Sequence, residues 1–205
     1  MFSKPALFDI LERTLIIGLF YPFAANNLTK YIFNHDPRAL LLVISEVLPV
    51  ILIALRNISP NMSMNPFDWG IGLLGSGLPL LITTQNDIHL LLPLGACVGI
   101  ITAGLFIQIA AKFSLGRSFG IVPANRGVKS QGPYRFVRHP MYAGYTIVHI
   151  GNFLMVPSLH NALFYLVTLA VQVTRIYREE AVLCQDIRYR AFARRVRYRL
   201  IPSVF

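Results

Sequence analysis

Charged residues are scarce in this chain. Only 14% of its 205 residues are Asp, Glu, Lys or Arg, whereas about 25% is usual in soluble domains. Apolar residues make up 55% of the sequence, and the mean hydropathy is +0.56. This composition excludes an ordinary soluble globular protein and indicates a membrane protein.

Cysteine is nearly absent as well. The two cysteines, Cys97 and Cys184, lie in an apolar stretch and in a basic tail. They have neither the spacing of metal ligands nor the number needed for a disulfide framework. We therefore expect both to be structural, and we expect no metal site.

Acidic residues are few, and most of the basic residues lie in two segments of the chain. The chain has 9 acidic and 19 basic residues, and 14 of the basic ones lie in 112–138 or from 175 onwards. A nucleic-acid-binding protein can show such clusters. Here each cluster adjoins an apolar run long enough to enter a bilayer, which favours cytoplasmic membrane flanks over nucleic acid as the partner.

Long apolar runs are what the sequence does contain. A membrane-spanning helix needs about 20 mostly apolar residues to cross about 30 Å of hydrocarbon. The candidate spans are roughly 11–33, 39–56, 67–84, 88–111, 140–157 and 159–177. We therefore predict an all-α, polytopic membrane protein of about five to six transmembrane helices, the last two forming a C-terminal hairpin. The run 67–84 is the weakest, because its glycines and Pro79 lower helix propensity.

The N-terminal run could be mistaken for a signal peptide. Asp9, Glu12 and Arg13 interrupt the approach to it, so we expect a membrane helix instead. Four spans would then precede the basic linker and place it on the same side as the N-terminus. By the positive-inside rule, we expect that side to be cytoplasmic.

Two glycine motifs in the apolar part predict helix packing. GIGLLG at 70–75 has the letters of a dinucleotide-binding loop, but neither a strand nor a helix start frames it. GACVG at 95–99 has the spacing that lets two membrane helices approach closely.

Polar residues inside the spans leave two interpretations open. Glu46, in LLVISEVLPV, is either a substrate or proton-relay residue or a structural acid with a hydrogen-bonding partner. His149 and Gln172, on the two arms of the hairpin, either line a substrate cavity or bond across the helices.

The chemistry is concentrated where the basic linker meets the hairpin. ANRGVKSQGPYRFVRHP should form an ordered loop, and Pro140 suits the first turn of the following helix, whose free N–H groups can hold a polar ligand. Arg175 and Glu179 are four residues apart and share a helix face, whereas Arg178 and Glu180 should point elsewhere. An acid and a base at a membrane exit suit either a zwitterionic ligand or an interfacial ion-pair cluster.

GPYRFVRHPMYAGY, followed by REEAVL and YRAFARRVRYRLIP, resembles the isoprenylcysteine carboxyl methyltransferase family and its bacterial and archaeal relatives. The resemblance covers roughly 112–202. It implies an integral membrane enzyme that uses S-adenosylmethionine and releases S-adenosylhomocysteine. Residues 1–111 would be variable N-terminal helices, and 112–205 the methyltransferase core with a cytoplasmic cofactor pocket.

The same resemblance implies roles for particular residues. Arg175 would be the substrate-binding arginine at the reaction site. The cofactor would contact Arg126, Gly127, Val128, Lys129, Tyr134, His139, Pro140, Met141, Tyr142 and Glu179.

The expected reaction is O-methylation of a carboxylate on a lipophilic substrate that enters from the membrane lipids. Methyl transfer needs in-line alignment, and an anionic nucleophile needs no general base. Methylation of a phospholipid amine or a thiol is an alternative. The tail lacks the family's Phe-Gly and resembles that of membrane sterol reductases, so an NADPH-dependent double-bond reductase is a second alternative, and a non-enzymatic transporter or lipid-binding protein a third. The sequence leaves the oligomeric state open.

Overall fold

The described part of the chain is all helical. The computed structural model describes residues 4–35, 37–59, 61–78 and 90–205. Within them the helices are α1 (Lys4–Asn34), α2 (Pro37–Leu55), α3 (Pro66–Gly77), α4 (Leu94–Leu115), α5 (Pro140–Met155), α6 (Leu159–Leu183) and α7 (Ile187–Arg195). No strand occurs in these ranges, so the all-α prediction is confirmed for them.

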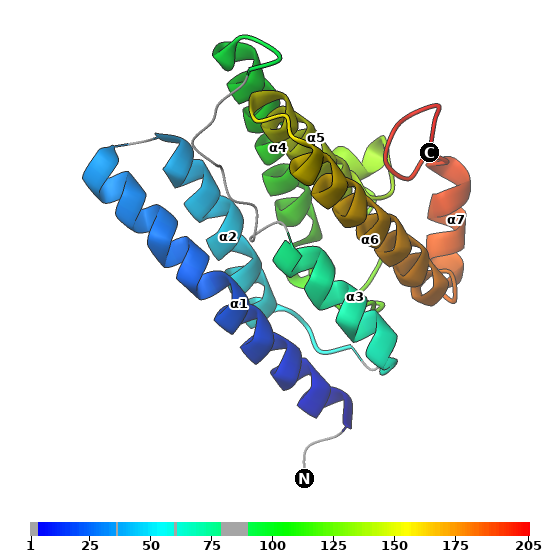
Figure 1. Ribbon diagram of the computed structural model, residues 1–205. Helices are drawn as coiled ribbons and strands as arrows, with labels where there is room; N and C mark the ends of the chain where they lie inside the picture. Colours follow the sequence, from blue (N-terminus) through cyan, green and yellow to red (C-terminus); the bar gives the residue numbers. More distant parts are fainter. Residues whose placement is uncertain (1–3, 36, 60, 79–89) are drawn as a thin grey trace.

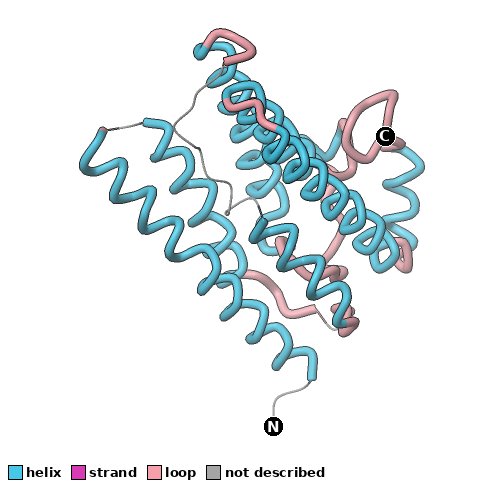
Figure 2. The backbone as a smooth tube through the Cα atoms, in the orientation of Figure 1, coloured by secondary structure: helices cyan, strands magenta, loops and turns pink. Residues whose placement is uncertain are grey.

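The helices lie in neighbouring pairs. α1 packs along α2, α4 along α5, and the short α3 along α6, while α7 lies at the far end of α6 (Figure 1). The chain between α4 and α5 is a long loop with two short 3-10 turns, Gly116–Ser118 and Gly132–Arg135 (Figure 2). Outside these two turns the linker, 116–139, is non-helical, as expected for residues 124–139 from their Gly and Pro content.

Local sequence explains where several helices begin. Asn65 caps α3 by accepting a hydrogen bond from the N–H of Phe67, and Ser158 caps α6 by accepting one from the N–H of Asn161. Pro140 occupies the first turn of α5, where its missing N–H costs nothing. α5 and α6 follow one another after a three-residue connection, as predicted for the hairpin.

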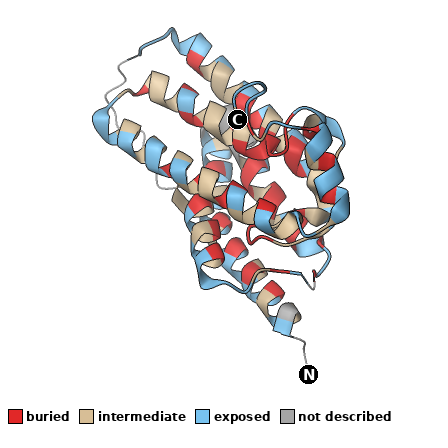
Figure 3. Ribbon diagram, turned by 90° about the vertical axis from the view of Figure 1, so that its right-hand side faces the viewer, coloured by how far each residue is buried: buried red, intermediate tan, exposed pale blue. Residues whose placement is uncertain are grey.

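One described helix, Leu94–Ser118, is long and apolar enough to cross a membrane, and Val43–Leu55 is a shorter apolar helix. Each of the six predicted spans contains a helix, but residues 79–84 of the third and 88–89 of the fourth lie outside the described residues. Many helical positions are exposed (Figure 3). Large apolar side chains among the exposed residues include Phe33, Phe106 and Leu166.

The glycines that bring helices together differ from those predicted. Among the described residues, nothing lies within 4 Å of a Cβ built on Gly95 or Gly99, so the expected close approach at 95–99 is wrong. Gly104 and Gly144 mediate it instead: a Cβ on Gly104 would lie 2.8 Å from the Gly144 carbonyl oxygen. In the 70–75 motif, Gly75 does pack closely.

Replacing Gly144 by alanine should therefore destabilise the α4–α5 pair. The added Cβ would lie 2.7 Å from Cγ of Gln108 and 2.8 Å from the backbone oxygen of Gly104. Overpacking of this kind costs about 1–3 kcal/mol. Thermal unfolding in detergent measures the loss. Gly99→Ala, with open space around it, should be neutral or slightly stabilising, and an equal loss in both variants would contradict the packing account.

Candidate functional site

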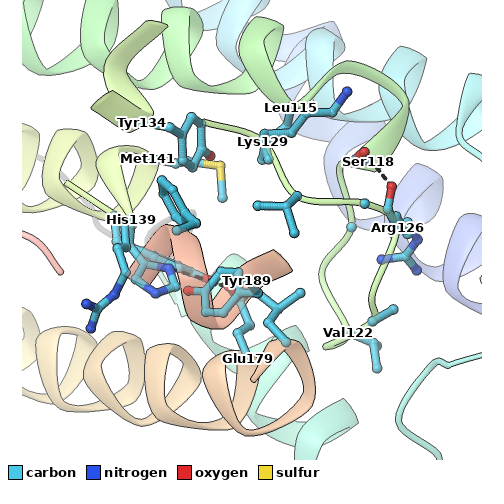
Figure 4. Close-up of a pocket in the computed structure, with 18 residues that line it drawn as sticks. Leu115, Ser118, Val122, Arg126, Lys129, Tyr134, His139, Met141, Glu179 and Tyr189 are labelled. Atoms are coloured by element: carbon cyan, nitrogen blue, oxygen red, sulfur yellow. Dashed lines mark hydrogen bonds and ion pairs between the residues drawn. The ribbon is translucent and has the colours of Figure 1, made fainter. Parts of the chain in front are cut away.

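One pocket opens where the linker, α5, α6 and α7 meet. It has about 760 Å³ of empty space, a volume that includes open solvent at its mouth. Nine of the ten predicted cofactor residues line it: Arg126, Gly127, Val128, Lys129, Tyr134, His139, Met141, Tyr142 and Glu179 (Figure 4). Pro140, the tenth, is fully buried in the first turn of α5 and does not line the pocket.

Glu179 is the carboxylate of this pocket. It accepts a hydrogen bond from the Tyr142 hydroxyl, and its Oε2 lies 3.7 Å from Nδ1 of His139. Burial raises the pKa of the Tyr134 phenol well above its usual range, and the charge of Glu179 adds to this. The pocket therefore combines one carboxylate with neutral aromatic hydroxyls, which suits a ligand with hydroxyl groups and a cationic centre.

The neighbouring Glu180 was expected only to point away from the Arg175–Glu179 face, and it does so. Its Oε1 lies 2.7 Å from Nε of Arg138 and 3.2 Å from Nε2 of His139, and its Oε2 lies 2.9 Å from Nε of Arg199. Burial opposes its ionisation, but the hydrogen bonds from His139 and Arg138 outweigh this and lower the pKa of Glu180 to about 2. Glu180 thus joins the start of α5, the end of α6 and the C-terminal loop.

Arg175 lies behind the pocket wall rather than in it. Its guanidinium carbon is 5.2 Å from the ring centroid of Tyr142, whose hydroxyl bonds Glu179. The guanidinium also donates to the Ile121 carbonyl oxygen at 3.3 Å and to Ser76 Oγ at 3.5 Å. Tyr142 therefore separates the predicted substrate arginine from the predicted cofactor carboxylate.

Sequence reasoning missed the residues that support the linker from behind. Glu12 of α1 accepts hydrogen bonds from the backbone N–H groups of Ile121 at 2.7 Å and Val122 at 3.0 Å. Its other oxygen lies 2.7 Å from Arg56 and 3.5 Å from Arg126. The sequence does show an acid, Glu12, at the edge of an apolar run. Nothing in the local sequence, however, identifies its hydrogen-bonding partner Ile121, which lies 109 residues away.

The Arg126 side chain points towards Glu12 of α1. Ser118 Oγ donates to the Arg126 carbonyl oxygen at 2.8 Å (Figure 4). Burial lowers the pKa of the Arg126 guanidinium to about 10; the charge of Arg56 acts in the same direction, and Glu12 opposes it. A guanidinium remains charged at that value. Its side chain thus contacts Glu12, while the backbone around Gly127 (φ +97°) faces the pocket.

Glu46 and His149 lie elsewhere and do not line the pocket. Both carboxylate oxygens of Glu46 accept from the Asn27 amide, at 3.2 and 3.1 Å. His149 is buried and stacks on Tyr165 with 5.2 Å between ring centroids. For Glu46, the structure provides the hydrogen-bonding partner that a structural role requires.

Comparison with known proteins gives one family. Residues 94–187, just under half of the chain, match the phospholipid methyltransferase family. No curated protein matches the chain. The match begins 18 residues before the predicted region of resemblance and ends before most of the basic tail. Residues 94–187 are thus similar to the phospholipid methyltransferase family, which belongs to the isoprenylcysteine carboxyl methyltransferase-like superfamily of membrane methyltransferases.

Proposed function

We propose that this protein transfers a methyl group from S-adenosylmethionine to a lipophilic acceptor at the membrane surface. The observation that carries the proposal is the pocket itself: it holds Glu179, Tyr134 and Tyr142 together, from three separate segments, within the region of the family match. When bound there, the cofactor would supply an electrophilic methyl group.

The residues present fit that cofactor. The Glu179 carboxylate can accept hydrogen bonds from ribose hydroxyls or an amino group. The aromatic rings of Tyr134 and Tyr142 suit a sulfonium, since a cation over a ring face is attracted by its quadrupole. Backbone N–H groups at the start of α5 can hold the cofactor carboxylate.

Arg175 would hold the acceptor on the other side of Tyr142. It is buried and charged, and among the described residues it has no carboxylate within 4.0 Å. An anionic group such as a carboxylate fits that environment and could attack without a general base. Phospholipid amines are a second class of acceptor, favoured by the family match.

Membrane embedding is part of the proposal. The apolar helix Leu94–Ser118 and exposed side chains such as Phe106, Phe113 and Leu166 would face lipid. The basic residues of the linker and tail flank the pocket, which we place on the cytoplasmic side. A lipophilic acceptor would arrive from the bilayer and a polar cofactor from water.

S-adenosylhomocysteine should raise the unfolding temperature of the detergent-purified protein, because a ligand that binds only the native state stabilises it. Glu179→Gln should weaken this binding about 10- to 100-fold, since a hydrogen bond to a charged group contributes about 1.5–3 kcal/mol.

The matched control is Glu46→Gln, the same change on α2 outside the pocket, which should leave the affinity unaltered. NADPH serves as the parallel ligand. Protection by NADPH alone would contradict the proposal in favour of a reductase. An unchanged affinity in Glu179→Gln would remove that residue from the cofactor site.

A further inference from the structure

The outer face of α7 is strongly basic. Exposed arginines lie on this helix or directly after it, at Arg188, Arg190, Arg194, Arg195 and Arg197. Arg188 pairs with Asp186 at 2.9 Å, and Asp186 is the one acid in the sequence 181–205. Within the described ranges the side chains of the other four arginines form no ion pair or hydrogen bond. So much positive charge without an internal partner favours an external, anionic one.

The inner face of α7 forms part of the pocket wall. Tyr189 and Phe192, three residues apart on one side of the helix, are buried and line the pocket. Asp186 caps α7 and also accepts a hydrogen bond from the Asn125 amide at 3.1 Å, next to Arg126 of the linker. α7 therefore supplies one wall of the pocket and is tied to the loop that forms another.

α7 lies at the level where α6 would leave the membrane. α6 has 25 residues, and at about 1.5 Å per residue it is longer than the roughly 30 Å of hydrocarbon to be crossed. Its end at Leu183 therefore reaches the headgroups, and α7 follows beside that end, at the outside of the bundle (Figure 1). Ile187, 72% exposed, shares the outer face with Arg190 and Arg194 at spacings of three and seven residues. An exposed apolar side chain among arginines is typical of a helix at a lipid surface.

We propose that the outer face of α7 binds anionic phospholipids of the membrane in which the protein lies, and that this contact holds the pocket wall of Tyr189 and Phe192 in its cofactor-binding position. Phosphate groups match the planar fork of an arginine. A lipid surface fits better than a soluble polyanion, because Ile187 would insert among the lipids. The inference rests on the membrane embedding and the cofactor of the proposed function.

The test uses the full-length protein in nanodiscs of phosphatidylcholine, with and without phosphatidylglycerol. Hydrogen exchange of the backbone amides of 189–196 and the affinity for S-adenosylhomocysteine are both measured. Phosphatidylglycerol should slow the exchange and tighten the affinity about fivefold, the lower end of typical couplings between two sites. Both effects should shrink in about 1 M salt, where the Debye length falls to about 3 Å.

Arg190→Gln combined with Arg194→Gln should remove most of both effects. Each arginine near an anionic surface contributes about fivefold to binding, so the pair accounts for about 25-fold. Changing the same pair to lysine keeps the charge and should preserve the wild-type response. Lys4→Gln with Lys30→Gln is the matched control: it removes the same charge from exposed positions on α1 and should leave the response to phosphatidylglycerol intact.

Two outcomes would overturn the inference. One is equal exchange of 189–196 in the two lipids; the other is protection of this segment by a short DNA duplex and not by phosphatidylglycerol, which would make the partner a nucleic acid. Slower exchange with an unaltered affinity would support the lipid contact and refute its link to the pocket. If S-adenosylhomocysteine binds in neither lipid, the proposed function fails, and the exchange measurement still decides the lipid contact.

Discussion

Replacing Glu180 by glutamine is expected to lower the free energy of unfolding by about 3–5 kcal/mol, the usual cost of breaking a buried ion pair by removing one partner. The carboxylate accepts hydrogen bonds from Arg138 and Arg199 and contacts His139. Glutamine keeps the shape but leaves two guanidinium groups without a counter-charge. Denaturant unfolding in detergent measures the difference.

Glu179→Gln makes the same chemical change at the adjacent position. Glu179 is 20% exposed and faces the pocket, so its loss should affect ligand binding far more than stability. Equal destabilisation by the two substitutions would show that Glu180 has no special structural role.

Stability should also depend on acid pH through Glu180. Its pKa is about 2 in the folded protein and 4.5 in an ordinary glutamate. Because the folded value is depressed, the carboxylate stabilises the protein fully above about pH 4.5, and this contribution is lost as the pH falls towards 2. Glu180→Gln should flatten the stability profile across that window.

The second large effect is expected at Glu12. Glu12→Ala leaves two buried backbone N–H groups without an acceptor and removes a counter-charge from Arg56 and Arg126. The combined loss should again reach about 3–5 kcal/mol. Because the Ile121–Val122 segment leads into the pocket wall, affinity for S-adenosylhomocysteine should fall together with stability.

Thr14→Ala provides the control on the same helix. Its exposed hydroxyl bonds only the Ile10 carbonyl of its own turn, so the change should stay within about 0.5 kcal/mol. Glu12→Gln keeps an acceptor for the N–H groups and should fall between the two. A Glu12→Ala protein with wild-type stability would refute the supporting role of α1.

The sequence predicted the helices well because their signal is local. Apolar runs indicated α1, α2 and α4–α6, and the family resemblance indicated that Tyr142 and Glu179 belong to the same site. The glycine motif at 95–99 misled because spacing does not identify the neighbour, and Gly104 opposite Gly144 makes the close approach instead.

The contacts of Glu180 and Glu12 that hold the site's segments together could not be predicted, for a related reason. The interaction of Glu180 with Arg199 and that of Glu12 with Ile121 depend on how distant segments meet in space. No periodicity or local motif encodes such a meeting. The roles of the individual pocket residues remain predictions for the binding experiments.

The position of Glu12 also has a consequence for synthesis. Translation produces Asp9, Glu12 and Arg56 long before residue 121, and their ion pairs at 2.7 Å join α1 to the end of α2. The first hairpin can therefore assemble with its acidic residues already neutralised. When the linker emerges, the Glu12 carboxylate can already be in place to accept from the N–H groups of Ile121 and Val122. The pocket's loop would then be positioned by a helix made before it.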